Sequence, residues 1–218
     1  MKDISVYCLK YADSVLLEGL IFDGGNKEKN IPITFAFYLI KACGRNILID
    51  CGCNTMPGFD MKKYYSPAFV LRQIGLLTDE ITDVIITHSH HDHIEAIKYF
   101  KNAVIHISKA EYEIGKHYIT EDVKVNVFEN DYAINPQIKI IEWGGHSEGS
   151  AIVELKTGDN IHIFAGDECY TNANIERKIC TGTFTDREKA ENFVRKYSNK
   201  KYRVHTCHDL SLKTERII

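Results

Sequence analysis

The sequence lacks the features that would place this chain in a membrane or on a nucleic acid. Its apolar runs all fall short of the roughly 18 residues that a transmembrane helix requires. No apolar stretch follows a basic segment near the first residue, so we expect no signal peptide, no membrane contact and a cytoplasmic location. The 27 lysine and arginine residues do not outnumber the 30 acidic ones, and the net charge of −3 gives no sign of a nucleic-acid partner.

The chain also has few features of a disulfide-stabilised or multidomain protein. Its seven cysteines are odd in number and follow no regular spacing, which is typical of free thiols in a reducing compartment. Repeats, low-complexity segments and linkers are absent from the sequence. With 218 residues, of which 44% are hydrophobic, the chain can bury one substantial core, and we expect a single domain over residues 1–218.

Histidine, by contrast, is concentrated in one place. Four histidines and an aspartate fall within residues 87–93, directly after the apolar run Val84-Ile85-Ile86. The run is typical of a strand, and the polar segment is typical of the loop at its carboxyl end, where ligands are commonly held. Imidazoles and a carboxylate in the pattern His-x-His-x-Asp-His suit zinc or a comparable first-row ion, although a solvated histidine-rich loop is the alternative. The pattern comprises His88, His90, Asp92 and His93, and leaves out His91.

Three later segments, taken with this motif, resemble the metallo-β-lactamase superfamily, whose signature continues with a lone histidine, a lone aspartate and a final histidine. The segments are Gly144-Gly145-His146-Ser147-Glu148-Gly149-Ser150, the apolar run 161–167 ending in Gly-Asp, and the short run 202–209 ending in His-Asp. Each candidate ligand follows a predicted strand, so the strands can deliver all of them to one edge. The candidates are His146, Asp167 and His208, with His205 as a weaker rival.

The resemblance implies a fold and a metal assignment. The fold class is α/β (α+β), a four-layer αββα sandwich of the metallo-β-lactamase type. Two divalent ions are implied, with zinc expected and iron, manganese or cobalt as alternatives. Zinc lowers the pKa of a bound water to about 7, and a second ion roughly 3.5–4 Å away polarises the substrate oxygen. By resemblance, one ion is held by His88, His90 and His146, the other by Asp92, His93 and His208, and Asp167 lies between them.

Two positions indicate the branch of the superfamily. His90 stands where the oxygen-reducing diiron branch usually has a carboxylate, which favours hydrolysis over redox chemistry. Tyr170 lies three residues after Asp167, as in the N-acyl homoserine lactonase branch, where such a tyrosine contacts the substrate. A phenol there can donate a hydrogen bond to the developing oxyanion, although a chance tyrosine among twelve is the alternative. The chain departs from that branch in having Cys51 where threonine is usual, and in being shorter.

The sequence therefore predicts a metal-dependent hydrolase of a lactone or related ester. By resemblance, a hydroxide bridging the two metals attacks the carbonyl of a small-molecule substrate, and Asp92 or Tyr170 handles the leaving-group proton. One alternative is a thioesterase similar to glyoxalase II, although the chain lacks that branch's added C-terminal helical region. Another is a non-catalytic metal or ligand sensor on the same fold. A homodimer is also compatible with the sequence. For Cys169 and Cys207, beside two of the candidate ligands, we expect packing roles, with tuning of the site or sensitivity to oxidation as alternatives.

Local patterns predict the elements around these motifs. Alternating residues indicate strands over 5–9, 34–40 and 103–107, and Asp23-Gly24-Gly25-Asn26 indicates a turn. Helical patterns cover residues 66–75, 93–100, 108–116 and 186–197, the last with a solvated charged face. The connector over residues 54–63 enters close to Asp50, so it is a candidate active-site flap, with a surface loop capped by the core as the alternative. Its nearby aromatic residues are Phe59, Tyr64 and Tyr65.

Overall fold

Strand β2 (Asn30–Ala42) illustrates how the sequence builds the layers of this protein. The computed structural model describes residues 4–218, and in it β2 is buried on both faces. Successive side chains of a strand point to opposite faces, so alternate residues enter different cores. The first core contains Ile33, Phe35, Phe37 and Leu39, and the second contains Ala36, Tyr38, Ile40 and Ala42. A strand that is apolar on both faces requires cover on both sides of its sheet.

Two sheets face one another across the second core. The first has seven strands in the order β12-β1-β2-β3-β4-β5-β6; β1 to β3 are antiparallel and β3 to β6 are parallel. The second has five strands in the order β11-β10-β9-β8-β7. The strands of the first sheet besides β2 are β1 (Ser5–Leu17), β3 (Arg45–Ile49), β4 (Asp83–Ile85), β5 (Val104–Ser108), β6 (Lys124–Phe128) and β12 (Glu215–Arg216). Those of the second sheet are β7 (Tyr132–Asn135), β8 (Ile138–Glu142), β9 (Ala151–Thr157), β10 (Asn160–Phe164) and β11 (Tyr202–His205).

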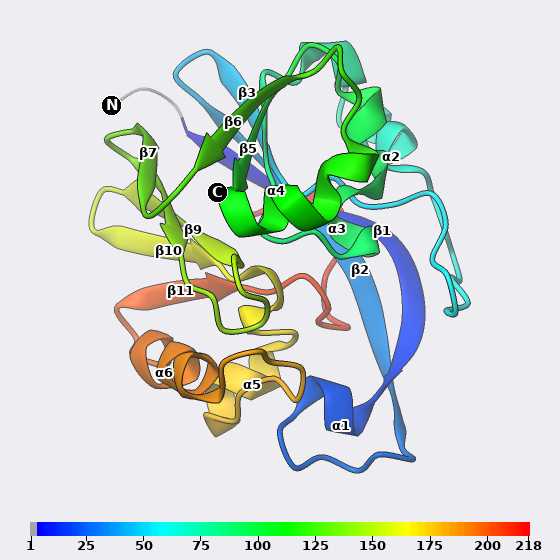
Figure 1. The fold of residues 1–218 in the computed structure, drawn as a ribbon, viewed down its shortest axis with the longest axis vertical. Helices are drawn as coiled ribbons and strands as arrows, with labels where there is room; N and C mark the ends of the chain where they lie inside the picture. Colours follow the sequence, from blue (N-terminus) through cyan, green and yellow to red (C-terminus); the bar gives the residue numbers. More distant parts are fainter. Residues whose placement is uncertain (1–3) are drawn as a thin grey trace.

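Helices cover the outer face of each sheet, which completes four layers (Figure 1). On the first sheet lie α2 (Pro67–Gln73), α3 (His91–Ile94), η2 (Glu95–Tyr99) and α4 (Lys109–Gly115). On the second lie α5 (Asn172–Arg177) and α6 (Arg187–Tyr197). The short elements α1 (Glu18–Ile21), η1 (Thr78–Glu80), η3 (Lys116–Tyr118) and η4 (Gly166–Glu168) lie in connections. The αββα sandwich expected from the sequence is confirmed.

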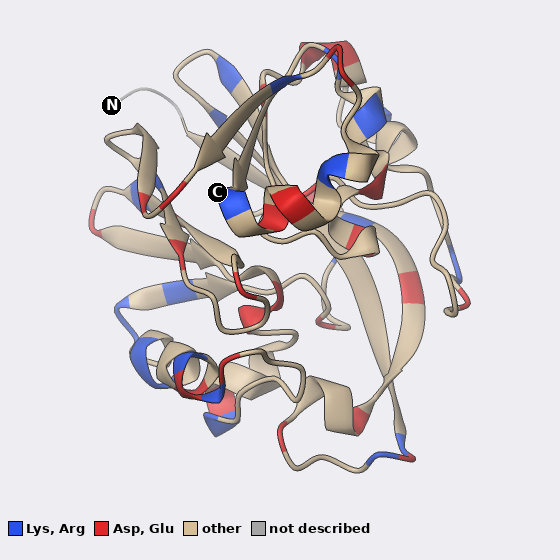
Figure 2. Ribbon diagram, in the orientation of Figure 1, with Lys and Arg blue, Asp and Glu red and all other residues tan. Residues whose placement is uncertain are grey.

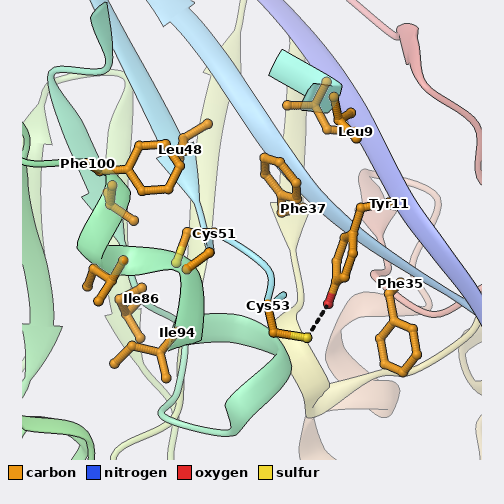
Figure 3. Close-up of a cluster of buried hydrophobic side chains, with 14 of the residues drawn as sticks. Leu9, Tyr11, Phe35, Phe37, Leu48, Cys51, Cys53, Ile86, Ile94 and Phe100 are labelled. Atoms are coloured by element: carbon orange, nitrogen blue, oxygen red, sulfur yellow. Dashed lines mark hydrogen bonds between the residues drawn. The ribbon is translucent and has the colours of Figure 1, made fainter. Parts of the chain in front are cut away.

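The first core lies between the seven-stranded sheet and its helices. Figure 3 shows aromatic and aliphatic side chains from β1, β2 and the α3 region meeting there, with Tyr11 next to Cys53. The Tyr11 hydroxyl lies 3.7 Å from Cys53 Sγ and also donates a hydrogen bond of 3.0 Å to the Asp92 carbonyl oxygen. This core therefore fixes the backbone of the histidine-rich segment at Asp92.

Helix α6 has the charged outer face that the sequence predicts. Its Asp186 side chain caps the helix by accepting from the Lys189 N–H at 3.0 Å. Basic and acidic residues are interspersed along the helix in Figure 2, while Ala190, Phe193, Val194 and Tyr197 are buried against the second sheet. Across residues 4–218, every helix is too short or too polar to cross a bilayer.

Several predicted boundaries are wrong in informative ways. The strand expected over residues 5–9 continues to Leu17, because β1 pairs with β2 along its whole length. The helix expected over residues 93–100 begins two residues earlier and changes to a 3-10 helix at Glu95. A turn does occur over the Asp23 segment, where Gly25 N donates to Phe22 O at 2.9 Å, but it lies within a longer connection that also contains α1.

The distal ends of β1 and β2, together with α1, form an arm that we define as residues 14–31. In Figure 1 this arm runs away from the first sheet and ends close to α5. Two backbone hydrogen bonds attach it there: Asp23 N donates to Cys180 O at 2.9 Å, and Gly182 N donates to Leu20 O at 3.0 Å. The Asn174 side chain donates to Ile21 O at 2.7 Å. The arm therefore spans from the first sheet to the helical layer of the second.

Asp83 is a buried carboxylate whose charge stabilises the first sheet, so its replacement should make folding less sensitive to acid. Burial alone would raise the pKa of Asp83, but hydrogen bonds from His106, Arg45 and Thr82 outweigh it and lower the pKa below its ordinary value. A lowered pKa gives stability that is present above the unfolded value and is lost as pH falls through the folded value. We expect Asp83→Asn to cost about 2 kcal/mol at neutral pH.

This cost should shrink below about pH 4, the ordinary range of an aspartate. Urea unfolding at pH 7 and pH 3.5, in the presence of a chelator, measures both values. The exposed Asp79→Asn variant serves as control and should match the wild type at both pH values. A cost for Asp83→Asn that is independent of pH would contradict the expectation.

Candidate metal centre

The candidate ligands lie at the carboxyl ends of strands from both sheets. His88 follows β4 of the first sheet, with the rest of its motif entering α3. His146 follows β8, Asp167 follows β10 and His208 follows β11, all in the second sheet. Backbone bonds join the two sets of loops: Ala151 N donates to Thr87 O at 2.8 Å, for example. The predicted placement at strand ends is therefore observed, at an edge shared by the two sheets.

Four of these residues form a first group of donor atoms. The Nδ1 atom of His90 lies 3.0 Å from His88 Nε2 and 3.0 Å from His146 Nε2. One carboxylate oxygen of Asp167, Oδ2, lies 3.6 Å from His88 Nε2 and 3.7 Å from His146 Nε2. All four donor atoms lie within 4.8 Å of one another.

A second group lies on the other side of Asp167. Its other oxygen, Oδ1, lies 3.3 Å from His93 Nε2 and 3.1 Å from His208 Nε2. Asp92 Oδ2 lies 3.4 Å and 3.6 Å from the same two nitrogens. Cys207 Sγ lies 3.2 Å from Asp167 Oδ1 and belongs to this group, whereas the sequence predicted a packing role with tuning of the site as an alternative. Asp167 therefore presents one oxygen to each group.

The outer ring nitrogens of the histidines are held by hydrogen-bond acceptors. His88 Nδ1 lies 3.1 Å from Thr87 Oγ1, and His93 Nδ1 lies 2.8 Å from Asp50 Oδ2. His146 Nδ1 and His208 Nδ1 each lie 2.9 Å from a backbone carbonyl oxygen, those of Thr183 and Thr34 respectively. Protons on these four Nδ1 atoms direct each Nε2 into the cluster, and in the neutral ring Nε2 carries the lone pair with which histidine binds metal.

Burial and the carboxylates have opposite effects on the rings. Burial lowers the pKa of His88 and of His146, so both rings stay neutral. At His93 and His208 burial also acts to lower the pKa, but the neighbouring carboxylates, Asp167 foremost, raise it above its usual value. The same attraction lowers the pKa of Asp92 and Asp167 against the effect of burial. Buried carboxylates that remain charged require positive charge beside them.

These residues fit a pair of divalent cations. Tetrahedral zinc with bonds of about 2.0–2.1 Å to nitrogen needs ligand nitrogens roughly 3.3 Å apart, close to the 3.0 Å separations of the first group. His93 Nε2 is buried and has no hydrogen-bond partner among the described residues, although it is directed at Asp167. A bound cation would satisfy this nitrogen and neutralise the carboxylates.

Three buried carboxylates support the ligand loops, and sequence reasoning assigned no role to any of them. Asp50 follows β3 and accepts from Thr87 N at 2.8 Å and Thr87 Oγ1 at 2.9 Å, in addition to orienting His93. Glu168 accepts from the backbone N–H of Gly145 and of His146, both at 3.0 Å, and burial raises its pKa to about 7. The third is Glu111 of α4.

Glu111 ties the two histidine loops to one another. Its Oε2 accepts from the Ser89 N–H at 2.7 Å and from the Ser89 hydroxyl. Its Oε1 accepts from the Ser147 hydroxyl at 2.6 Å and from Gly149 N at 3.2 Å. Ser89 lies between His88 and His90, and Ser147 follows His146, so one carboxylate fixes both segments of the first group.

A cavity of about 270 Å³ opens beside both groups. Its polar wall includes Asp92, Asp167 and Tyr170. Of the aromatic residues in and after the connector, Phe59 lines the cavity, whereas Tyr65 is exposed and stacks on Phe69 with ring centroids 5.2 Å apart. The apolar wall consists of Leu16, Leu20, Ile33, Phe35, Met56 and Phe59. The cavity can accept an apolar group next to the cluster.

The remaining candidates lie outside the two groups. His205 Nε2 lies 3.0 Å from His162 Nδ1 on the second sheet, so the weaker rival of His208 does not approach the cluster. His91 lines the cavity with its Nδ1 3.0 Å from the Tyr118 hydroxyl. Cys169 Sγ donates to Thr171 O at 3.2 Å, in agreement with the expected packing role. All seven cysteines are free thiols in the structure.

Comparison with known proteins identifies the family. Residues 36–204 match the metallo-β-lactamase superfamily, so the chain belongs to that superfamily, as the sequence predicted. An N-acyl homoserine lactonase from a Bacillus species is 27% identical over 119 residues, which are 50% of this chain and 47% of that protein. N-acyl homoserine lactonase AiiB from Agrobacterium fabrum is 24% identical over 183 residues, 66% of each chain. The aligned part of this chain thus spans about half the length of the Bacillus relative.

Solved structures agree on the fold. A 1.4 Å structure of an N-acyl homoserine lactone hydrolase, with the product N-hexanoyl-L-homoserine bound at its catalytic metal centre, superposes with a TM-score of 0.83 at 20% identity, covering 98% of both chains. The dizinc quorum-quenching lactonase AidC, also with N-hexanoyl-homoserine, gives a TM-score of 0.77 at 18% identity, covering 97% of this chain and 90% of that chain. These similarities show that the chain shares the fold of both proteins.

Proposed function

We propose that this protein is a dinuclear metal-dependent hydrolase that opens a lactone or cleaves a related ester. The observation that carries the proposal is the position of Asp167, which offers one oxygen to each of two donor groups beside a cavity with an apolar wall. The relatives that are N-acyl homoserine lactonases point to an acylated lactone as the substrate class. We also infer that one domain carries the activity, because each donor group draws ligands from both sheets.

Separate residues would hold the ions, transfer the proton and bind the acyl group. Bound divalent ions would supply a water that is activated at neutral pH and a Lewis acid for the substrate carbonyl. His88, His90 and His146 would hold one ion, His93, Asp92 and His208 the other, and Asp167 would contact both. Asp92 lines the cavity, where it can receive a proton and pass it to the leaving oxygen. The apolar wall would bind the acyl part of the substrate and exclude water.

Tyr170 is proposed as the donor that stabilises negative charge on the substrate. Its ring lines the cavity and lies 5.2 Å, centroid to centroid, from the His208 ring. Burial raises the pKa of its phenol well above the usual value, so the hydroxyl remains protonated. That hydroxyl is 2.9 Å from Thr183 Oγ1, which holds it in place but must share it with the substrate.

Removing this hydroxyl should slow the reaction without removing metal. We expect Tyr170→Phe to reduce kcat about 10²-fold, the size of effect found for one oxyanion donor, with zinc content unchanged. The assay is hydrolysis of N-acyl homoserine lactones, simple lactones and a glutathione thioester by metal-analysed protein. Tyr64→Phe is the matched control, because the Tyr64 hydroxyl bonds to Asn54 Oδ1 at 3.2 Å outside the cavity.

Each outcome of this panel decides between functions. Lactone turnover that falls only in Tyr170→Phe supports the proposal. Turnover of the thioester alone would move the protein to the glyoxalase-like function. Two bound metals with no turnover of any substrate in the panel would indicate a sensor, and equal lactone rates in both variants would remove Tyr170 from the mechanism.

A further inference from the structure

The second donor group contains a sulfur that the family signature does not include. Cys207 Sγ lies 3.2 Å from Asp167 Oδ1 and within 4.8 Å of the Nε2 atoms of His93 and His208. The Cys207 side chain is almost fully buried, with 4% of its surface exposed. Cys207 lies directly before His208 in the segment that follows β11, so adjacent residues of one loop present both side chains.

We propose that Cys207 is a ligand of the ion in the second group, which would make that site a mixed nitrogen, oxygen and sulfur site. The inference rests on the two-group metal centre of the proposed function. On binding, a bond forms between sulfur and the ion, and the thiol proton leaves to solvent without any change of oxidation state. A coordinating divalent ion deprotonates a thiol outright, so burial of Cys207 does not prevent this step.

The geometry supports coordination rather than packing alone. A zinc ion with a bond of about 2.3 Å to sulfur and about 2.0–2.2 Å to oxygen places those two atoms roughly 3.1–3.6 Å apart for bond angles between 90° and the tetrahedral value, a range that includes the 3.2 Å observed. His93 provides an independent observation. Its side chain is buried, with 2% exposed, and its Nε2 has no hydrogen-bond partner among the described residues. It is directed into the group that contains Cys207.

The two sides of the second group differ in character. Asp92 lines the cavity, whereas Cys207 is absent from the cavity wall, so the sulfur approaches the group from the protein interior. A thiolate there adds a soft donor away from the substrate. Soft donors favour zinc and cobalt over manganese and magnesium. The second site should therefore retain zinc more tightly than a site made only of nitrogen and oxygen.

The competing explanation is that the thiol acts only as a hydrogen-bond donor. Cys207 Sγ also lies 3.4 Å from the carbonyl oxygen of Gly166, so the thiol can donate to that oxygen or to Asp167. In that case Cys207 would orient Asp167 and would not touch the ion. The two explanations differ in whether sulfur is bonded to the metal.

Cobalt substitution tests the difference by absorption. The full chain with two cobalt ions bound should show a near-ultraviolet sulfur-to-cobalt charge-transfer band, which Cys207→Ser should lose. Cys169→Ser is the matched control, because Cys169 is equally buried but bonds to Thr171 O, and it should keep the band. We expect Cys207→Ser to weaken binding of the second zinc about tenfold or more, by analogy with losses at supporting residues of metal sites.

A measurement on the wild type alone keeps the test decisive if Cys207→Ser fails to fold. X-ray absorption of the protein with two zinc ions should show one sulfur neighbour for every two zinc ions, at about 2.3 Å. Two bound zinc ions with only nitrogen and oxygen neighbours would overturn the inference while leaving the proposed function intact. A sulfur neighbour without turnover of any lactone would instead leave the inference intact and count against the function.

Discussion

Replacing Asp167 with asparagine should abolish metal retention and turnover together. Asp167 offers one oxygen to each donor group, and both groups contain histidines within 3.1–3.7 Å of it. Asparagine keeps the shape but removes the charge and turns an N–H donor toward one group. Without activated water, lactone hydrolysis should fall by at least about 10³-fold, because the pKa of free water is far above that of metal-bound water. His88→Ala should have the same consequence for the first group.

Two measurements check this expectation independently of activity. Elemental analysis after gel filtration gives the number of metal ions per chain. Thermal unfolding with and without zinc gives the stabilisation that zinc binding provides. Zinc at 1,000 times its dissociation constant stabilises the wild type by about 4.1 kcal/mol, and this gain should vanish in Asp167→Asn. His117→Ala is the control, since His117 is exposed and its Nδ1 bonds only to Ile114 O. Full activity in a folded His88→Ala variant would refute the metal mechanism.

Replacing Glu111 should have the second largest effect, although its carboxylate takes no place in either donor group. Glu111→Ala leaves the backbone N–H groups of Ser89 and Gly149 without acceptors, and both are buried. Each buried donor without a partner costs about 1–3 kcal/mol, so the free energy of unfolding should fall by about 2–6 kcal/mol. Zinc affinity should also fall, by about 10–100-fold, because the carboxylate that accepts from both loops of the first group is lost.

Urea unfolding of the metal-free protein and competitive zinc titration separate these two losses. Glu111→Gln should be milder, since its remaining oxygen can still accept from one loop. Glu113→Gln on the same helix is the matched control, because Glu113 is exposed and pairs only with Lys116 at 2.7 Å. Wild-type zinc affinity in a folded Glu111→Ala variant would show that the loops hold their positions without it.

The parts of the site that follow strands could be predicted from sequence, because a strand end is a local signal. The run Val84-Ile85-Ile86 before the histidine motif marks such an end, and Asp50 after β3 could have been found by the same reasoning. The periodicity of β2 likewise encodes which residue faces which core. These features depend on residues close together in the chain.

Other parts depend on pairings that a single sequence does not encode. Glu111 lies inside a helix, and nothing local distinguishes it from the exposed Glu113 two residues later. Its partners are 22 and 36 residues away. Cys207 was open to the same uncertainty, since only the packing of β11 beside β10 brings its sulfur to Asp167. The roles of side chains whose partners lie in distant segments could therefore be found only from the structure.

The arm of residues 14–31 separates two tasks that the site must perform. Leu16 and Leu20 of the arm supply part of the apolar wall of the cavity, yet the arm contributes no donor atom to either group. Its attachments run to the carbonyl of Cys180 and the amide of Gly182, next to Thr183, whose carbonyl lies 2.9 Å from His146 Nδ1. Changes at Leu16 and Leu20 can therefore alter which molecule fits without removing a donor atom, so relatives of this chain can diverge in substrate by varying side chains that belong to neither group.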